Sequence, residues 1–185
     1  VLNNLEFLDF IIKESKFSTD RDLIQRALYR YENYWLPFYS NLMKSKCYTS
    51  HDLYPPFDIA WIWRCHMLSP IEYRNDCELI SNDGQVLDHF CFSLFDMRQK
   101  QKLCKSLWDE SNIKAKFDFY DIETSIGDLN EYKNYVFRID FDMIKMISDK
   151  LSKFYELVSL PHFHSKDYIE QFMDKYKLYF FYSSQ

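Results

Sequence analysis

The sequence predicts an all-α fold, an irregular bundle of about six or seven helices around one buried central helix. Two observations predict it. The 185-residue chain has only 2 Gly, so few turns can require a positive φ, which favours helices with short connections over a β-sandwich. Apolar residues also recur at helical spacing through most of the chain. The length fits a single domain over residues 1–185 that can bury a sizeable core.

The first two helices are predicted from their apolar stripes and their boundary residues. Leu2–Glu14 carries apolar residues at helical spacing. Ser18 or Thr19 is expected to cap a second helix, whose apolar and aromatic stripe runs from residue 24 to residue 38. Pro37 should kink or stop that helix, because it has no N–H to donate.

The central helix is predicted over Phe57–Leu68, after a linker. Pro56 suits the first helical turn, and Pro70 ends the run from the other side. The helix is apolar nearly all round, which is typical of a buried helix. Asp58 and His66 share one face but lie about 12 Å apart along the axis. Each therefore needs a polar partner from another part of the chain.

The next segments are predicted to be two further helices and a loop-rich insertion. A short helix is expected over Ile71–Ile80, then a turn at residues 82–84. Asp96–Glu110 is amphipathic, with Leu103, Leu107 and Trp108 on its apolar side. Its basic side chains are Arg98, Lys100, Lys102 and Lys105. A solvated helix face explains them better than a binding patch. Residues 117–135 are the insertion.

The last two helices have clear boundary residues. Asp140 opens a helix that Pro161 ends. Ser165 is expected to cap the final helix, whose apolar residues recur at helical spacing.

Composition narrows the class of protein. The net charge of −5 argues against a nucleic-acid surface, which is usually basic. Five Cys without a C-x-x-C pair indicate reduced intracellular thiols, so a cytoplasmic location is expected. No apolar run is long enough to cross a membrane. The chain starts at Val1 without Met, so it is expected to be a fragment of a longer protein or a short relative of one.

One run carries a family signature. Residues 55–77 contain a proline pair, an aspartate, an aromatic stretch ending in Trp63-Arg64-Cys65-His66, and then Leu68-x-Pro70-x-x-Tyr73-x-x-Asp76-Cys77. This run resembles the signature of the glycine-rich domain-containing protein-like family. Residues 30–37 and the segment that begins at residue 158 resemble flanking stretches of the same family. The departure is Arg64, where the family often has His.

The resemblance implies little chemistry. The biochemical activity of this domain is not established. Plant members carry a second copy of the motif, sometimes an RNA-binding module, and then a glycine-rich tail, and they are linked to development and stress responses. With 2 Gly, this chain has no such tail.

The signature supplies the candidate site residues, which are interpreted as structural or binding residues. They are Asp58, Trp61, Trp63, Arg64, His66, Pro70, Tyr73, Asp76 and Cys77. No catalytic residue is predicted. His66 is interpreted as a core histidine whose ring nitrogens pair with a carboxylate, from Asp76 or Asp58, and with a backbone carbonyl. Arg64 is expected to reach Asp76 or Glu72 as a fork.

Metal binding is not predicted, although three histidines are weak candidates. Residues 64 and 66 point about 200° apart on a helix, so they would not share an ion. His66 is one weak candidate. His162 and His164 flank Phe163 in a loop, where both rings could lie on one side, but no third ligand is evident. No cofactor is predicted.

Three functions remain open at this point. The first is a non-enzymatic interaction or scaffold domain with an unidentified protein partner, which predicts a buried, internally paired motif and an apolar patch elsewhere. The second is a metal or small-molecule site, with catalysis as an option, around His66, Asp76 and Cys77. The third is RNA association through the basic side chains of residues 98–105.

Overall fold

The protein is all-α, as the sequence predicts. The computed structural model describes residues 2–14, 19–80, 86–88, 92–118, 131–160 and 165–183, and none of these lies in a β-strand. The chain divides into two compact units, Val1–Asp149 and Lys150–Gln185. No described helix is long and apolar enough to cross a bilayer.

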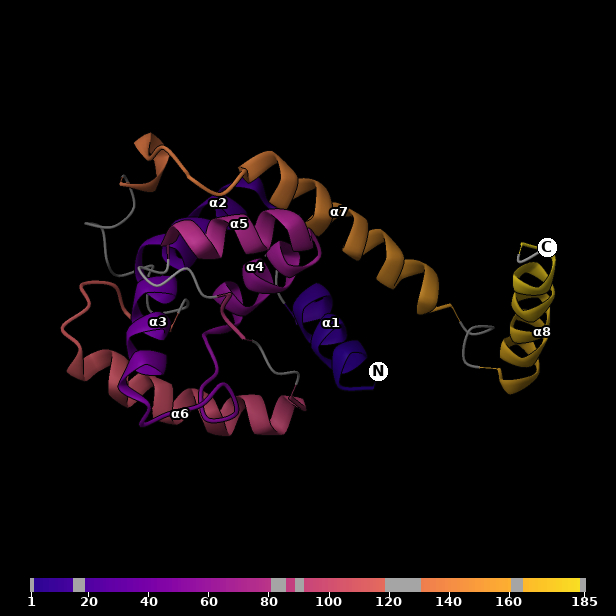
Figure 1. The fold of residues 1–185 in the computed structure, drawn as a ribbon, viewed down its shortest axis with the longest axis horizontal. Helices are drawn as coiled ribbons and strands as arrows, with labels where there is room; N and C mark the ends of the chain where they lie inside the picture. The colour runs from indigo at the N-terminus through magenta and orange to yellow at the C-terminus, as the bar shows by residue number, and fades with distance from the viewer. Residues whose placement is uncertain are drawn as a thin grey trace. The chain divides into compact units, whose positions relative to one another are not determined.

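The helices follow the predicted order (Figure 1). Their bounds are α1 Leu2–Glu14, α2 Arg21–Arg30, α3 Leu36–Ser45, α4 Phe57–Met67, α5 Pro70–Ile80, α6 Leu94–Glu110, α7 Phe141–Val158 and α8 Lys166–Ser183. A π-helical turn, Tyr31–Trp35, joins α2 to α3. The predicted central helix is α4, and it ends one residue before the predicted end.

Helix α4 lies in the core of the first unit, packed against α2, the π-helical turn and α5. Trp63 is 2% exposed and sits in a cluster of aromatic rings. Its ring centroid lies 5.0 Å from that of Tyr39, 5.7 Å from that of Trp35 and 6.3 Å from that of Tyr31. These are favourable separations for tilted aromatic pairs. The aromatic stripe predicted for residues 24–38 therefore builds the core around α4.

Of the two outcomes expected for Pro37, a kink or a stop, the stop does not occur, because α3 continues through Pro37 to Ser45. The π-helical turn precedes it, and the Leu36 N–H donates to the Tyr31 carbonyl five residues back. Proline interrupts a helix because it lacks an N–H and its ring clashes with the preceding turn. The wider π turn changes the hydrogen-bond register where that clash would occur. The side chain of Asn33 donates to the carbonyl of Tyr29 within the same turn.

The cap of α2 is Asp20, so the prediction of a Thr19 cap is wrong; Ser18 lies outside the described residues. The Asp20 carboxylate accepts from the N–H groups of Asp22 and Leu23, at 2.9 and 3.1 Å. Asp and Thr are both good capping residues. Because Thr19 and Asp20 are adjacent, residue type alone does not decide which of them caps α2.

The face that α6 buries also differs from the prediction. Met97, Cys104 and Trp108 are buried, whereas Leu103 is 41% exposed. The buried face is thus rotated around the helix from the predicted apolar stripe. Within the predicted insertion at 117–135, residues 119–130 lie outside the described part. The described remainder holds a single 3₁₀ turn, Tyr132–Asn134.

The predicted caps of the last two helices are confirmed. The Asp140 carboxylate accepts from the N–H groups of Asp142 and Met143, at the start of α7. The Ser165 hydroxyl accepts from the N–H of Tyr168 at the start of α8.

Candidate functional site

Three successive residues, at the junction of α2 with the π-helical turn, reach three different partners. Arg30, Tyr31 and Glu32 are each at most 4% exposed. Successive helical residues point about 100° apart, so each side chain leaves the helix in its own direction. Arg30 pairs with Asp58, Tyr31 contacts His66, and Glu32 binds the segment before α7.

Arg30 and Asp58 form a buried ion pair. The Arg30 Nε lies 2.9 Å from Asp58 Oδ2, with the two side chains 4% and 0% exposed. The Nη2 of Arg30 also donates to the carbonyl of Phe117 at 2.7 Å. Burial raises the pKa of Asp58, and both the Arg30 charge and the N–H of Ile59 oppose that shift. Asp58 lies in the first turn of α4, where a negative charge is favoured.

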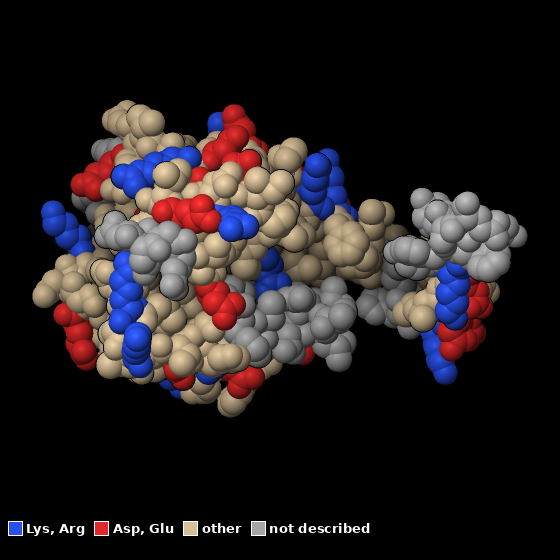
Figure 2. Space-filling model, in the orientation of Figure 1, with Lys and Arg blue, Asp and Glu red and all other residues tan. Residues whose placement is uncertain are grey.

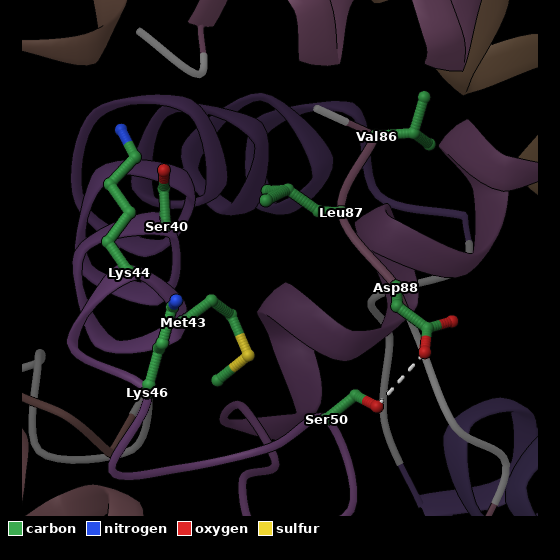
Figure 3. Close-up of a pocket in the computed structure, with 8 residues that line it drawn as sticks. All are labelled: Ser40, Met43, Lys44, Lys46, Ser50, Val86, Leu87 and Asp88. Atoms are coloured by element: carbon green, nitrogen blue, oxygen red, sulfur yellow. Dashed lines mark hydrogen bonds between the residues drawn. The ribbon is translucent and has the colours of Figure 1, made fainter. Parts of the chain in front are cut away.

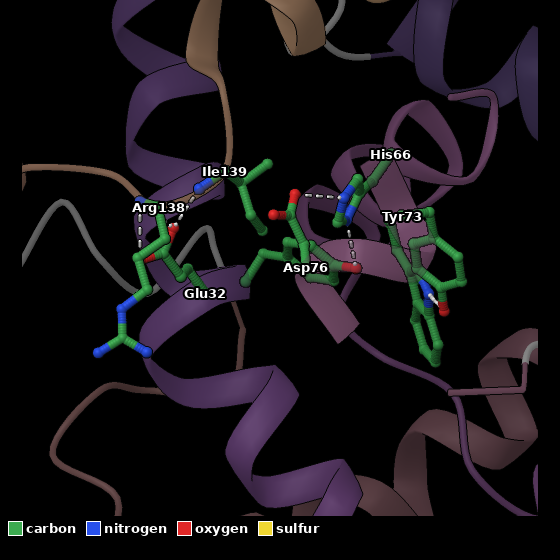
Figure 4. Close-up of polar contacts among 8 residues, drawn as sticks. Glu32, His66, Tyr73, Asp76, Arg138 and Ile139 are labelled. Atoms are coloured by element: carbon green, nitrogen blue, oxygen red, sulfur yellow. Dashed lines mark hydrogen bonds and ion pairs between the residues drawn. The ribbon is translucent and has the colours of Figure 1, made fainter. Parts of the chain in front are cut away.

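His66 bridges Tyr31 and Asp76 (Figure 4). Its Nε2 lies 3.1 Å from Asp76 Oδ2, and its Nδ1 lies 3.1 Å from the Tyr31 hydroxyl. The predicted carboxylate partner is thus Asp76, since Asp58 is held by Arg30. The second partner is a tyrosine hydroxyl, so the predicted backbone carbonyl is wrong.

The protonation of this trio follows from its surroundings. Burial lowers the pKa of His66 to about 4. Burial, and then the carboxylates of Glu72, Glu32 and Asp140, raise the pKa of Asp76 to about 6. At neutral pH, Asp76 is therefore an acceptor and His66 is neutral. A neutral ring has one N–H, so Nε2 donates to Asp76 and Nδ1 accepts from Tyr31.

Glu32 accepts hydrogen bonds from the segment that leads into α7 (Figure 4). Its carboxylate accepts from the Tyr135 hydroxyl at 2.7 Å, the Arg138 N–H at 3.0 Å and the Ile139 N–H at 3.1 Å. A buried carboxylate is costly unless its lone pairs are used, and these donors use them.

The two tryptophans of α4 donate to side chains of other elements. The indole N–H of Trp61 donates to the Ser148 hydroxyl on α7 at 2.9 Å. The indole N–H of Trp63 donates to the Tyr73 hydroxyl at 2.8 Å, and that hydroxyl donates to the Leu87 carbonyl at 2.6 Å. The signature thus connects α4, α5, α7 and the segment at residues 86–88.

The remaining predicted residues offer little chemistry. The guanidinium carbon of Arg64 lies 4.3 Å from the ring centroid of Phe7, a cation–π contact. Pro70 is the first residue of α5. Cys65 and Cys77 are buried, and burial raises the pKa of both thiols. A thiol with a raised pKa is rarely ionised and is a poor nucleophile.

The arrangement does not resemble a metal centre. Among the residues that the structure describes, no group of three or more His, Cys, Asp and Glu side chains is placed to hold an ion. Both ring nitrogens of His66 already have partners. His162 and His164 lie outside the described residues.

Sequence reasoning missed Arg30, Tyr31, Glu32 and Ser148 as partners of the signature. The first three lie in residues 30–37, the flanking stretch that resembles the family. The available signal was that two charged residues, Arg30 and Glu32, flank Tyr31 of the aromatic core stripe. Their partners could not be assigned, because Tyr31 and His66 are 35 residues apart and Glu32 and Ile139 are 107 apart.

Comparison with known proteins identifies relatives. The sequence model of the family described as "Glycine-rich domain-containing protein-like" matches residues 72–185. The chain is 30% identical over 179 residues to Glycine-rich domain-containing protein 1 of Arabidopsis thaliana, covering 94% of this chain and 21% of that protein. It is 26% identical over 162 residues to Glycine-rich domain-containing protein 2 of the same plant, covering 88% and 20%. The chain thus spans about a fifth of each relative's length. No solved structure matches it significantly.

The buried ion pair predicts a large cost for removing one partner. Replacing Arg30 with Met leaves the Asp58 carboxylate buried without its cation. We expect the free energy of unfolding, measured in urea, to fall by about 3–5 kcal/mol. Arg74→Met is the control, because Arg74 pairs with Glu78 on the exposed side of α5 and should cost less than about 1 kcal/mol. Equal losses in the two variants would contradict the assigned importance of the Arg30–Asp58 pair.

The His66–Asp76 pair predicts a specific pH dependence of stability. The pKa of His66 is about 4 in the folded protein against an ordinary 6.5. As the pH falls, the unfolded chain therefore takes up a proton at His66 before the folded protein does. The free energy of unfolding is unaffected by His66 above pH 6.5 and falls as the pH is lowered toward 4. Asp76, with a pKa of about 6 against 3.8, takes up a proton in the folded state over an overlapping range and offsets part of the loss.

Asp76→Asn removes that offset. When the pH is lowered from about 7 to 5, we expect the free energy of unfolding of the Asp76→Asn variant to fall by roughly 1 kcal/mol more than that of the unchanged protein. Asp109→Asn, on the exposed side of α6, is the control and should follow the unchanged protein. An Asp76→Asn variant with a flatter pH dependence would refute the assigned shifts.

Proposed function

Because the chain belongs to the glycine-rich domain-containing protein-like family, we propose that it is a non-enzymatic, intracellular protein-interaction domain. Its signature builds the core, and its binding surface lies elsewhere. The observation that carries this proposal is that the polar groups of the signature pair with buried groups of the same chain. Groups engaged in this way are not available to a substrate.

A catalytic or ligand site around His66, Asp76 and Cys77 has less support. His66 is 0% exposed and has a partner at each ring nitrogen. A general base must lie within hydrogen-bond reach of the proton that it removes. Here the hydroxyl of Tyr31 occupies that position, and burial raises its pKa well above the ordinary value.

Exposed apolar side chains in the unit Lys150–Gln185 support an interaction surface, which we call the C-terminal apolar surface. It consists of three side chains of α8, Ile169, Phe172 and Met173, which are 44–53% exposed. Ile169, Phe172 and Met173 recur at helical spacing on α8, so they form one stripe. Exposed apolar stripes of this kind bind grooves or helices of protein partners.

RNA association has less support than protein binding. The basic side chains of α6 already contact neighbouring groups. Lys105 pairs with Asp118 at 3.1 Å, Lys100 lies over the ring of Phe92, and Arg98 lies 5.7 Å from the ring centroid of Phe10. On the face shown in Figure 2, basic and acidic side chains are interspersed. Strong nucleic-acid binding usually requires a continuous basic surface.

Site-specific photo-crosslinking tests the proposal. A photoreactive phenylalanine analogue at position 172 should form a defined protein adduct in cells, whereas the same analogue at position 109 should not. Adding Met173→Asp should reduce the adduct about tenfold or more, because a charge would then be buried against an apolar partner. Equal labelling at both positions, or at neither, would remove support for this surface.

Stability measurements separate binding from internal packing. Phe172→Asp should leave the free energy of unfolding within about 0.5 kcal/mol of the unchanged protein if Phe172 serves a partner. A loss of several kcal/mol would show that Phe172 packs inside the protein.

A further inference from the structure

Five partly exposed aromatic rings follow one another in the first unit. In spatial order they belong to Tyr34, Tyr29, Tyr135, Phe137 and Phe141, and we call them the aromatic row. Successive ring centroids are 5.7, 5.1, 5.1 and 6.3 Å apart. The first three pairs meet edge to face, with interplanar angles of 79–89°. The row therefore has ridges and slots rather than one flat platform.

Hydrogen bonds fix the rings of the aromatic row. The Tyr29 hydroxyl donates to Glu131 Oε2 at 3.0 Å, and the Tyr135 hydroxyl donates to Glu32 Oε1 at 2.7 Å. Glu32 also accepts from the backbone of residues 138 and 139. The rings of α2 and of the segment before α7 are thus already in position, so little side-chain freedom is lost when a partner binds.

A cavity of about 290 Å³ shares Tyr34 with the aromatic row. It lies between α3 and the chain that follows α6, and its volume is near the lower limit for a ligand site, roughly 300 Å³. Among the described residues that line it, none carries a charge. The principal ones are Pro37, Phe38, Asn41, Leu42, Ser111 and Ile113.

A core tryptophan fixes the walls of this cavity. Trp108 is 1% exposed, and its ring centroid lies 5.2 Å from that of Phe38 and 6.4 Å from that of Tyr34. Its indole N–H donates to the Ala115 carbonyl at 2.7 Å, which holds the chain that follows α6. Both walls are therefore formed before any ligand arrives.

A larger cavity, of about 410 Å³, lies at the C-terminal end of α3 and differs in its lining (Figure 3). Lys44, Lys46 and Asp88 line it together with Leu87. The Asp88 carboxylate is turned toward Ser50, whose hydroxyl donates to it at 3.1 Å. Charged groups are best left to water or to a charged ligand. Of these two cavities, the smaller one suits an uncharged group.

We propose that the smaller cavity and the aromatic row bind a proline-rich segment of a partner protein in the polyproline II conformation. Such a segment repeats every three residues, or about 9 Å. Two successive separations in the row, 5.7 and 5.1 Å from Tyr34 through Tyr29 to Tyr135, are comparable to one repeat. Uncharged proline rings would enter the slots and the cavity. The amide of Asn41 would donate to a peptide carbonyl, since these carbonyls have no partner within the segment. Aromatic-lined grooves recognise proline-rich segments in this way.

A single-stranded nucleic acid fits this surface less well. Its bases stack on the faces of aromatic rings along a basic groove. In the first three pairs of the row, the face of one ring is met by the edge of the next, and no described residue that lines the cavity is basic. The row belongs to the first unit and the C-terminal apolar surface to the second, so each can be tested without the other.

Titration of the isotopically labelled full chain, followed by NMR, tests the proposal. The probes are a capped decaproline peptide, a capped peptide of five glycine–serine repeats, and an oligouridylate of ten nucleotides. Decaproline should shift the amide signals of residues 29–34, 41–42, 111–113 and 135–141, with a dissociation constant at or below about 1 mM. The glycine–serine peptide should bind at least about tenfold more weakly, because it is flexible and has no rings. Equal binding of the two peptides, no shift with decaproline, or tighter binding of the oligouridylate at these residues would overturn the proposal.

Two pairs of variants locate the binding surface. Phe137→Ala removes one ring of the row, and Asn41→Asp places an acceptor and a charge in the cavity, so each should weaken decaproline binding about tenfold. Phe95→Ala on α6 and Asn75→Asp on α5 are the matched controls at exposed positions and should bind as the unchanged protein does. The dispersion of the amide signals reports whether each variant is folded. Unchanged decaproline affinity in folded Phe137→Ala and Asn41→Asp would overturn the assignment of this surface.

Discussion

The desolvation of Arg30 and Asp58 is the constraint on which much of the first unit depends. Removing an ion from water costs several kcal/mol in a protein, and that cost is offset only if the partner charge and further hydrogen bonds are in place. Here the Asp58 carboxylate lies 2.9 Å from the Arg30 Nε, and the Phe117 carbonyl accepts a hydrogen bond from the Arg30 Nη2. A buried ion pair adds little net stability compared with an apolar pair, but it heavily penalises alternative packings. It therefore sets the register between α2 and α4.

That register determines what the next two residues contact. With Arg30 directed at Asp58, the following positions of the same helical turn direct Tyr31 at His66 and Glu32 at the backbone of residues 138 and 139. The π-helical turn Tyr31–Trp35 contributes by carrying the chain past Pro37 into α3. A shift of one residue would leave three polar groups without partners in the core, each costing about 1–3 kcal/mol or more.

Local pattern predicted the helices well because helical periodicity, prolines and caps are short-range signals. The buried state of α4 followed from its apolar nature on nearly all sides. The rule that a buried imidazole needs a partner predicted a carboxylate for His66 but left Asp76 and Asp58 open, and the structure has Asp76. Long-range pairings did not follow. The contact of Glu32 with Ile139 spans 107 residues, and no local pattern indicates which donors a buried glutamate will meet. The prediction of a Thr19 cap failed because the neighbouring Asp20 caps α2, and the helix does not stop at Pro37 because a change of helix type precedes that residue.

The same geometry explains why a specific family signature need not mark a reaction. The identity of a residue can be fixed in two ways. The residue can contact a substrate, or its buried polar group can require a particular hydrogen-bonding or ion-pair partner inside the fold. In this chain, Asp58, His66 and Tyr73 meet the second condition, with partners 2.6–3.1 Å away. The hydrogen bonds from Trp63 through Tyr73 to Leu87 nevertheless end at a cavity wall. Residues of a structural signature can thus position the backbone of a distant surface segment, here residues 86–88, through hydrogen bonds alone.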